Sequence, residues 1–294
     1  MNGISKLAQV IVASVALVAC KNAGSAGNGG GGAGGGATTG TASTGTGKTY
    51  AGHGVVIAND LPGTSNAPHS WSVFAAYEPT TDNSTCVSTT YGACVLEECA
   101  HPSMGTAMTG GLVPAGTITI TAGQRVVTLT PNALNGYMFA ESSESLVEAG
   151  QTIAFAVAGA GAIPPHTGSV VAPYPVTVTT PALGSDVAID RTKTFPLAWS
   201  NGKPDDSVVA LFVASAPGSQ ETQIVNCTFD AASGGDVVPI ELLSKLPVGS
   251  TGTLDMHVES AADIVEAGDW QVRFLAQGRA TQGTNLVTTK VVFQ

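Results

Sequence analysis

The chain has few charged and few aromatic side chains. Charged residues make up 11% of its 294 residues and aromatic residues 5%, whereas charged residues are roughly 25% of an average domain. The 21 acidic residues outnumber the 11 basic residues, and the formal net charge is −10. Such a chain repels polyanions and has no basic stripe, which excludes nucleic-acid binding. The same sign excludes electrostatic adsorption to anionic lipid.

The sequence also lacks recognisable catalytic motifs. Its five histidines are dispersed, and no nucleophile elbow, zinc-binding histidine pair or phosphate-binding loop occurs. Glu97 and Glu98 near His101 form either a candidate acid/base cluster or a solvated loop face. Asp205 and Asp206 contribute either to a calcium site or to a polar turn. We predict no catalytic residue, no metal and no cofactor.

The N-terminal apolar run is too short to cross a bilayer. Residues 7–19 would span about 20 Å as a helix, whereas the hydrocarbon core of a membrane is about 30 Å thick. The run follows Lys6, the one charged residue before Cys20. Its length is typical of the apolar part of an export signal.

This run ends in Leu17-Val18-Ala19-Cys20, which resembles the lipobox of bacterial lipoproteins. The resemblance implies that residues 1–19 are a signal peptide and that Cys20 carries diacylglycerol and palmitate. Lys21 stands where retention in the inner membrane requires an aspartate, so we expect the outer membrane, at its periplasmic or cell-surface face. The alternative is an ordinary secretory signal with a chance cysteine. Residues 20–48 then form the lipid anchor and a glycine-rich linker, which has no apolar surface to bury and is predicted to be disordered.

Two segments of the chain repeat each other. Residues 141–150 (ESSESLVEAG) align without a gap with residues 259–268 (ESAADIVEAG), and an alternating apolar run follows each copy. A repeat of this kind indicates one structural unit present twice. Short alternating runs between turn residues predict strands. We therefore predict an all-β protein with two tandem, antiparallel, immunoglobulin-like β-sandwich units, residues 50–181 and 183–294, and positive φ angles at Gly150 and Gly268.

Two further resemblances support this fold. Leu197-Ala198-Trp199, followed by a polar turn and the apolar run 208–213, resembles the opening of fibronectin type III or immunoglobulin-like domains. The alternative fold is a jelly roll or another arrangement of two sheets. Residues 50–294, with the cluster Cys86…Tyr91-Gly92-x-Cys94…Cys99, resemble a group of bacterial lipoproteins with paired β-rich units. That resemblance implies location and fold, and implies no activity.

Local signals predict two more features. Pro173 and Pro175 confine the run 168–178 to a sheet edge or split it into two strands. Residues 241–246 are predicted to form the one short helix.

Besides Cys20, the chain has Cys86, Cys94, Cys99 and Cys227. An even number of cysteines in an exported chain indicates disulfides, and three pairings are open. The second unit has no other cysteine, so Cys227 must reach the first unit or stay free. We predict one local bond within residues 86–99 and one bond between the units to Cys227. The alternative, a zinc site at Cys94, Cys99 and His101, has only a loose match in spacing.

Trp71, Tyr77 and Trp199 are the candidate ligand-facing side chains, because aromatic rings can form a platform for sugars. Each also fits the hydrophobic core, since each lies in an alternating strand. We predict a non-catalytic module for binding or adhesion to an envelope protein or a glycan, attached to the membrane through its N-terminal lipid. The alternatives are a hydrolase with a site assembled from separate strands and a purely structural envelope protein. A deep cleft that gathers histidine and carboxylate side chains would favour the hydrolase.

Overall fold

The computed structural model describes residues 50–62, 69–80, 86–99, 111–141, 147–182, 186–217, 222–282, 285–286 and 288–294. The predictions for the signal peptide, Cys20, the linker and His101 lie outside the described residues. The side chains of Trp71, Cys86 and Cys99 lie outside them as well. The described part of the chain contains no helix with both the length and the hydropathy needed to span a bilayer.

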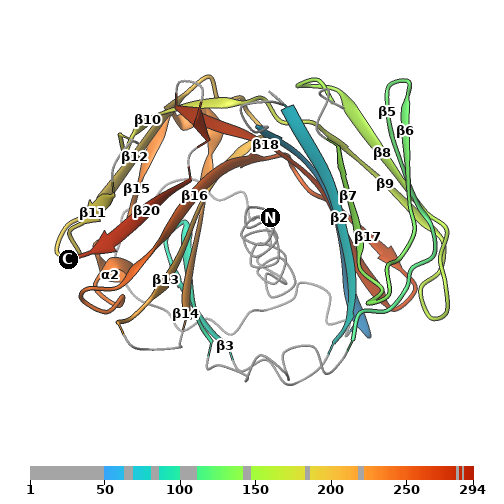
Figure 1. Cartoon of the computed structure of the whole chain (residues 1–294), viewed down its shortest axis with the longest axis horizontal. Helices are drawn as coiled ribbons and strands as arrows, with labels where there is room; N and C mark the ends of the chain where they lie inside the picture. The colour runs from blue at the N-terminus through green and yellow to red at the C-terminus, as the bar shows by residue number, and fades with distance from the viewer. Residues whose placement is uncertain are drawn as a thin grey trace.

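A first sandwich is formed by two packed layers (Figure 1). One layer has the strand order β7-β2-β1-β18-β17, and the other is a four-stranded sheet with the order β6-β5-β8-β9. Alternating side chains of both layers fill the space between them, and Phe155 of β8 stacks on Phe274 of β18 with ring centroids 5.0 Å apart. The strands are β1 (Gly52–Pro62), β2 (His69–Pro79), β5 (Ile118–Ala122), β6 (Arg125–Leu129), β7 (Tyr137–Glu141), β8 (Thr152–Val157), β9 (His166–Val171), β17 (Asp263–Ala267) and β18 (Trp270–Gln282).

A second sandwich lies beside the first (Figure 1). One layer has the order β11-β20-β16-β13-β14-β4-β3, and the other has the order β15-β12-β10-β18-β19. Trp199, Phe212 and Phe229 belong to the core between these layers. The elements are β3 (Cys86–Tyr91), β4 (Cys94–Cys99), β10 (Val176–Thr180), β11 (Val187–Ile189), β12 (Phe195–Ser200), β13 (Ser207–Ser215), β14 (Thr222–Asp230), the 3₁₀ helix η1 (Ala231–Ser233), β15 (Gly235–Val238), α2 (Ile240–Leu243), β16 (Thr251–Glu259), β19 (Asn285–Leu286) and β20 (Thr288–Phe293).

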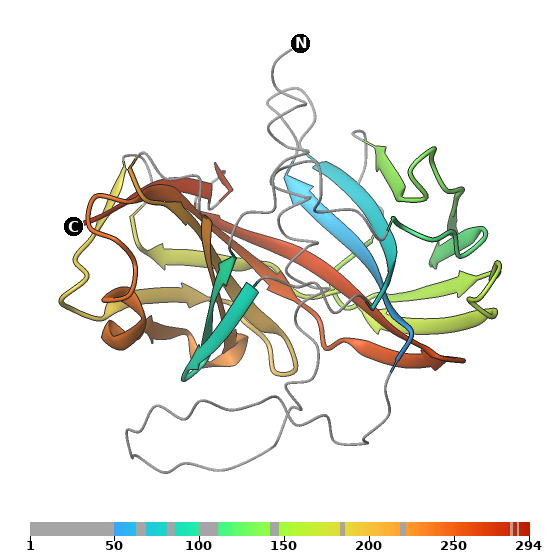
Figure 2. The same cartoon turned by 90° about the horizontal axis from the view of Figure 1, so that it is seen from below.

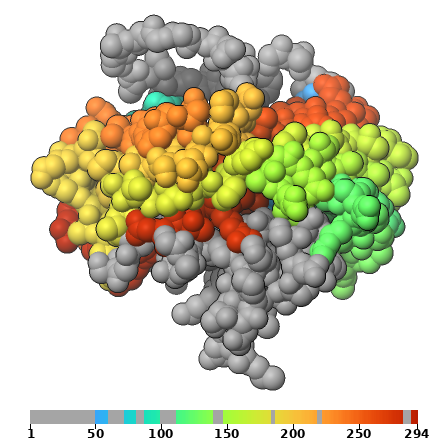
Figure 3. Space-filling view, turned by 90° about the horizontal axis from the view of Figure 1, so that it is seen from above, coloured from blue at the N-terminus to red at the C-terminus, as the bar shows by residue number. Residues whose placement is uncertain are grey.

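The all-β sandwich class is therefore confirmed, but each sandwich draws strands from both predicted segments. β17 and most of β18 complete the first sandwich, although they belong to residues 183–294. The β3–β4 hairpin extends the second sandwich by pairing with β14, although it belongs to residues 50–181. In the space-filling view, orange and red surface from the C-terminal part lies against green surface as well as against yellow surface (Figure 3). The two segments thus do not fold as separate blocks in sequence, and β1, β10 and β11 each make a parallel pair with a distant strand.

The 13-residue strand β18 belongs to both sandwiches. It pairs with β1 and β17 in the first sandwich and with β10 and β19 in the second, and β16 joins it near its middle (Figure 2). Gly278 lies at the crossing, where an added Cβ would be 3.0 Å from Pro173. A side chain at this position would therefore press on Pro173, and glycine allows the two segments to cross closely.

The proline-rich run also crosses between the sandwiches. The predicted split is confirmed, because β9 ends at Val171 in the first sandwich and β10 begins at Val176 in the second. The predicted helix is confirmed in shorter form as α2.

The repeat has a different meaning from the one predicted. Gly150 and Gly268 both have positive φ, +81° and +60°, and a strand follows each, as expected. These two strands, β8 and β18, do not occupy equivalent places in two units. They lie in opposite layers of the first sandwich, where Phe155 and Phe274 stack. The two copies therefore share a positive-φ glycine and the strand that follows it, but residues 263–267 form β17 whereas residues 147–150 form no strand.

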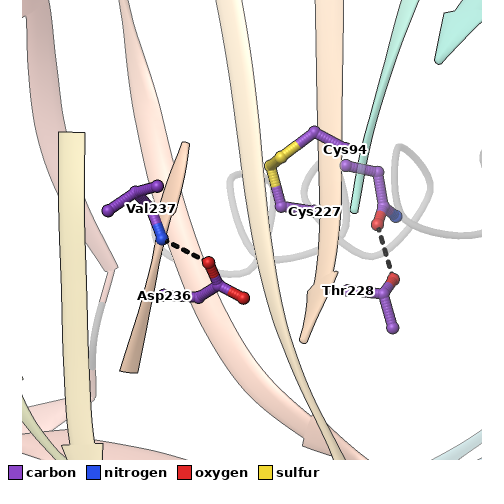
Figure 4. Close-up of a disulfide and its surroundings, with 6 residues drawn as sticks. Cys94, Cys227, Thr228, Asp236 and Val237 are labelled. Carbon is purple, nitrogen blue, oxygen red and sulfur yellow. Dashed lines mark hydrogen bonds between the residues drawn. A yellow bond between two sulfur atoms is a disulfide. The ribbon is translucent and has the colours of Figure 1, made fainter. Parts of the chain in front are cut away.

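Cys94 and Cys227 form a disulfide between β4 and β14 (Figure 4). The two residues are directly opposite each other in the register of these strands, with Cα atoms 3.9 Å apart, and both are buried. The predicted bond between the segments is confirmed, and the zinc alternative is wrong for Cys94. Cys86 and Cys99 are opposite each other in the β3–β4 register. The predicted local bond therefore joins Cys86 to Cys99, and it stays a prediction.

The first testable prediction concerns the buried disulfide. We expect the double variant Cys94→Ala/Cys227→Ala to lose about 2–5 kcal/mol of unfolding free energy, because the bond joins residues separated by 133 positions and constrains the unfolded chain. Urea unfolding under oxidising conditions measures this loss. The matched variant Cys86→Ala/Cys99→Ala should lose less, since it opens a shorter loop. Peptide mapping without reductant that finds a free Cys227 thiol would contradict the assignment.

Candidate functional site

One cluster of histidine and carboxylate side chains lies on β16, next to β18. Asp255, His257 and Glu259 alternate along β16 with residues of the second core, so they lie on the opposite face of the sheet. β18 contributes Arg273 and Gln277 to the same cluster. The sheet curves around this face, which is its concave side (Figure 1).

The members of this cluster are paired with one another. His257 Nδ1 lies 3.1 Å from Asp255 Oδ1, and His257 Nε2 lies 3.2 Å from Glu259 Oε1. Gln277 Nε2 donates a hydrogen bond of 3.0 Å to Glu259 Oε1, and Arg273 Nη2 lies 3.6 Å from Glu259 Oε2. Each nitrogen of the imidazole ring therefore faces a carboxylate oxygen, and this arrangement favours the doubly protonated ring.

The hydrogen bonds and charges of the cluster set the protonation states of its members. Burial lowers the pKa of His257, but the hydrogen bonds and charges of Asp255 and Glu259 outweigh burial and raise the pKa to about 9. Burial raises the pKa of Glu259, but its hydrogen bond and charge interaction with His257 and the charge of Arg273 lower it to about 2. At neutral pH the histidine already carries its proton and cannot act as a general base. The cluster is therefore a network of paired charges on one face of the sheet.

The acidic pairs singled out in the sequence lie on a strand and in a turn. Glu97 and Glu98 lie on β4, not on a loop, so their side chains point to opposite faces of the sheet. Glu97 is 4% exposed, and Glu98 accepts a hydrogen bond of 3.2 Å from Gln223 Nε2. The loop interpretation is therefore wrong, since both residues lie on a strand and Glu97 is buried. The acid/base cluster with His101 stays untested, because His101 lies outside the described residues.

The polar-turn interpretation of Asp205 and Asp206 is confirmed. Asp205 has a positive φ of 71°, and Asp206 Oδ2 accepts a hydrogen bond of 3.0 Å from the backbone nitrogen of Tyr174. Among the described residues, no group of three or more His, Cys, Asp or Glu side chains could hold a metal ion.

The ligand-facing assignment of Tyr77 and Trp199 is wrong. Tyr77 is 0% exposed and Trp199 is 4% exposed, because each ring belongs to a sandwich core. Their polar atoms are also occupied, since the Tyr77 hydroxyl lies 3.1 Å from His166 Nε2 and Trp199 Nε1 donates to the Ala231 carbonyl at 2.7 Å. Burial accordingly raises the pKa of Tyr77. The side chain of Trp71 lies outside the described residues.

The outer face of the four-stranded sheet is a surface that the sequence interpretation missed. Its outward side chains alternate with core residues along each strand, and none of them is charged. The signal for this face was the alternation itself, in which threonine, serine and alanine occupy the positions between core residues. The outward side chains are Thr119, Thr121, Val126, Thr128, Thr152, Ala154, Ala156, Thr167, Ser169 and Val171.

A trough runs along β8 on this face. Ala154 and Ala156 of β8 form its floor, because their short side chains lie between longer ones on β5 and β9. The walls are Thr119 and Thr121 on one side and Thr167 and Ser169 on the other, and the volume is about 460 Å³. Asp263 of β17 also lines the trough.

Two contacts fix the β9 wall of the trough. Asp263 Oδ2 accepts a hydrogen bond of 2.8 Å from the backbone nitrogen of Ser169. Gly168, between the two wall residues, lies against the ring of Phe274, and an added Cβ would be 2.2 Å from a ring carbon. A larger residue at position 168 would therefore displace either the Phe274 ring or β9.

No family model matches the chain, and no curated protein matches it. Among solved structures, the fibronectin(III)-like modules of Clostridium thermocellum CbhA are 11% identical, and the match covers 65% of this chain and 87% of that one with a TM-score of 0.19. A structure from a 1.5-MDa bacterial ice-binding adhesin is 14% identical, and the match covers 72% of this chain and 75% of that one with a TM-score of 0.17. At TM-scores this low, neither likeness carries an argument about this chain.

The second prediction concerns the pH dependence of the ion network. The folded pKa of His257, about 9, exceeds its ordinary value of 6.5, so its contribution to stability is fully present below pH 6.5 and is lost as the pH rises through 9. The folded pKa of Glu259, about 2, is below its ordinary value of 4.5, so its contribution is present above pH 4.5 and is lost as the pH falls through 2. Together the two groups contribute most between pH 4.5 and 6.5.

The variant His257→Gln tests this dependence. It should cost about 3 kcal/mol near pH 6, because it removes the positive charge between Asp255 and Glu259 and leaves Glu259 with Arg273 alone. It should also remove the loss of stability between pH 6.5 and 9. Urea unfolding at a series of pH values measures both effects. His166→Gln is the control. Burial lowers the pKa of His166, so any pH dependence of stability that His166 causes lies at lower pH than that of His257. An unchanged pH slope in His257→Gln would refute the interpretation.

Proposed function

We propose that the chain is a lipid-anchored, non-catalytic binding module of the bacterial envelope. The lipobox-like residues Leu17-Val18-Ala19-Cys20 support acylation at Cys20, and Lys21 supports the outer membrane as its location. The glycine-rich composition of residues 20–48 supports a flexible linker between the lipid and the sandwiches. The ligand is an envelope protein or a glycan.

The observation that carries a binding role is the contrast between two surfaces. The charged groups of the concave face are paired with one another, and His257 is protonated at neutral pH. The four-stranded sheet instead exposes a broad uncharged face whose hydroxyl groups are available to a partner. A rigid sheet face with oriented hydroxyls can bind without performing chemistry.

The third prediction tests the anchor. We expect Cys20→Ser to abolish incorporation of radiolabelled palmitate and to lower the share of the full chain in the membrane fraction, because the lipid on Cys20 is the proposed attachment. Cell fractionation with detection of the label measures this. The control Cys94→Ala/Cys227→Ala should keep the label, since those cysteines form a disulfide within the folded chain. Label that persists in Cys20→Ser would contradict acylation at this residue.

The binding role is tested on the same protein. The full chain in detergent should retain at least one component of an immobilised panel of envelope proteins and polysaccharides, and should leave the retained component chemically unchanged. Mass spectrometry of the bound material detects cleavage. Release of cleaved products would favour the hydrolase instead, and retention of no component would favour a purely structural role.

A further inference from the structure

We propose that the trough along β8 binds a single chain of an uncharged polysaccharide. This inference rests on the proposed binding function and names its surface and its ligand class. The binding elements are the hydroxyl groups of Thr119, Thr121, Thr167 and Ser169 and the methyl floor of Ala154 and Ala156.

The geometry of the walls suits a polymer with hydroxyl groups on both sides. Hydroxyl-bearing residues on the same strand are two positions apart, so they recur about every 6.8 Å along the trough. β5 and β9 flank β8, so the two walls are about 9.6 Å apart, measured between strand axes. The trough therefore offers two parallel rows of hydroxyls at the width of one extended chain.

The chemistry of the walls matches that of a sugar. A threonine or serine hydroxyl both donates and accepts a hydrogen bond, and so does each sugar hydroxyl. The alanine methyl groups offer a small apolar floor to the C–H groups of a sugar ring. A row of acceptors alone or of donors alone would select a different ligand.

The charges around the trough select a neutral ligand. None of the outward side chains of the four-stranded sheet is charged, although the whole chain carries −10. The ionisable group that lines the trough is the carboxyl of Asp263. Its negative charge repels an anionic polysaccharide, while its oxygens can accept hydrogen bonds from sugar hydroxyls.

A peptide fits the trough less well than a polysaccharide. The backbone of β8 is already paired with β5 on one side and β9 on the other, so a peptide cannot add a strand there. The floor consists of alanine side chains at equivalent positions and offers no separate pockets for peptide side chains.

The fourth prediction tests the trough with the full-length protein in detergent. The neutral probes are dextran, amylose, mannan and xylan, and the anionic probes are heparin and alginate. We expect binding to at least one neutral probe and to neither anionic probe, measured by isothermal titration calorimetry.

Two variants then locate the site. Thr121→Val/Thr167→Val removes one hydroxyl from each wall at nearly constant shape, and it should weaken binding about tenfold, the effect of two hydrogen bonds. Ala154→Lys places a long charged side chain on the floor and should abolish binding. The matched controls are Thr90→Val/Thr251→Val and Ala188→Lys, which make the same changes at exposed strand positions of the second sandwich and should bind as the parent does. Thermal unfolding of each variant establishes that it is folded.

The outcomes separate this inference from the proposed function. Retention of an envelope protein without binding of any polysaccharide overturns the trough site and leaves the binding function in place. Preference for an anionic probe, or unchanged affinity in both trough variants, also overturns it. Self-association of the parent that Ala154→Lys removes, measured by light scattering, would assign the face to a second copy of the chain and overturn it as well. If the full chain retains no component of the panel and binds no polysaccharide, both the binding function and the trough site are overturned.

Discussion

The pairing of β18 with strands of both sandwiches holds the molecule together. Its even-numbered side chains enter the first core from Trp270 to Ala276 and the second core at Ala280. Arg273 and Gln277 lie on its opposite side and join the ion network of β16. Because one continuous strand carries these contacts, rotation of one sandwich against the other would break backbone hydrogen bonds and expose core side chains. The disulfide between Cys94 and Cys227 acts within the second sandwich, where it joins the β3–β4 hairpin to β14.

This construction separates the polar groups of the molecule into two kinds of surface. On the concave face, buried charges must be paired, since an unpaired charge in that setting costs several kcal/mol. Asp255, His257 and Glu259 meet this requirement with each other and with their neighbours on β18. On the outer face of the four-stranded sheet, the outward positions carry hydroxyl and methyl groups and need no partner, because water solvates them. The second surface is therefore the one that can exchange water for a ligand.

Local sequence signals predicted local structure well and failed for long-range pairing. Alternation identified strands such as β5 and β8, glycine identified the two positive-φ turns, and the prolines identified the break between β9 and β10. A period of two reveals that one face of a strand is buried, but it does not reveal against which strand. The pairing of β1 with β18 joins distant parts of the chain, and neither strand carries a local mark of it.

The same limit explains the outcome for the candidate sites. Tyr77 and Trp199 show the same alternation whether they face a ligand or a core, so only the packed structure assigned them to the cores. His257 and its carboxylates lie two residues apart on β16, which a strand assignment brings to one face, but their partners on β18 depend on pairing. The trough forms only because β8 lies between β5 and β9. The sequence does not show this strand order, so its small side chains alone could not predict the trough.

Native-state hydrogen exchange of β18 tests the central role of this strand most directly. Backbone amides before and after Gly278 should exchange with one common free energy, equal to that of global unfolding, because both sandwiches open together when the strand is released. Exchange of residues 270–277 and residues 279–282 with two clearly different free energies would show that the sandwiches unfold independently, and would contradict the account.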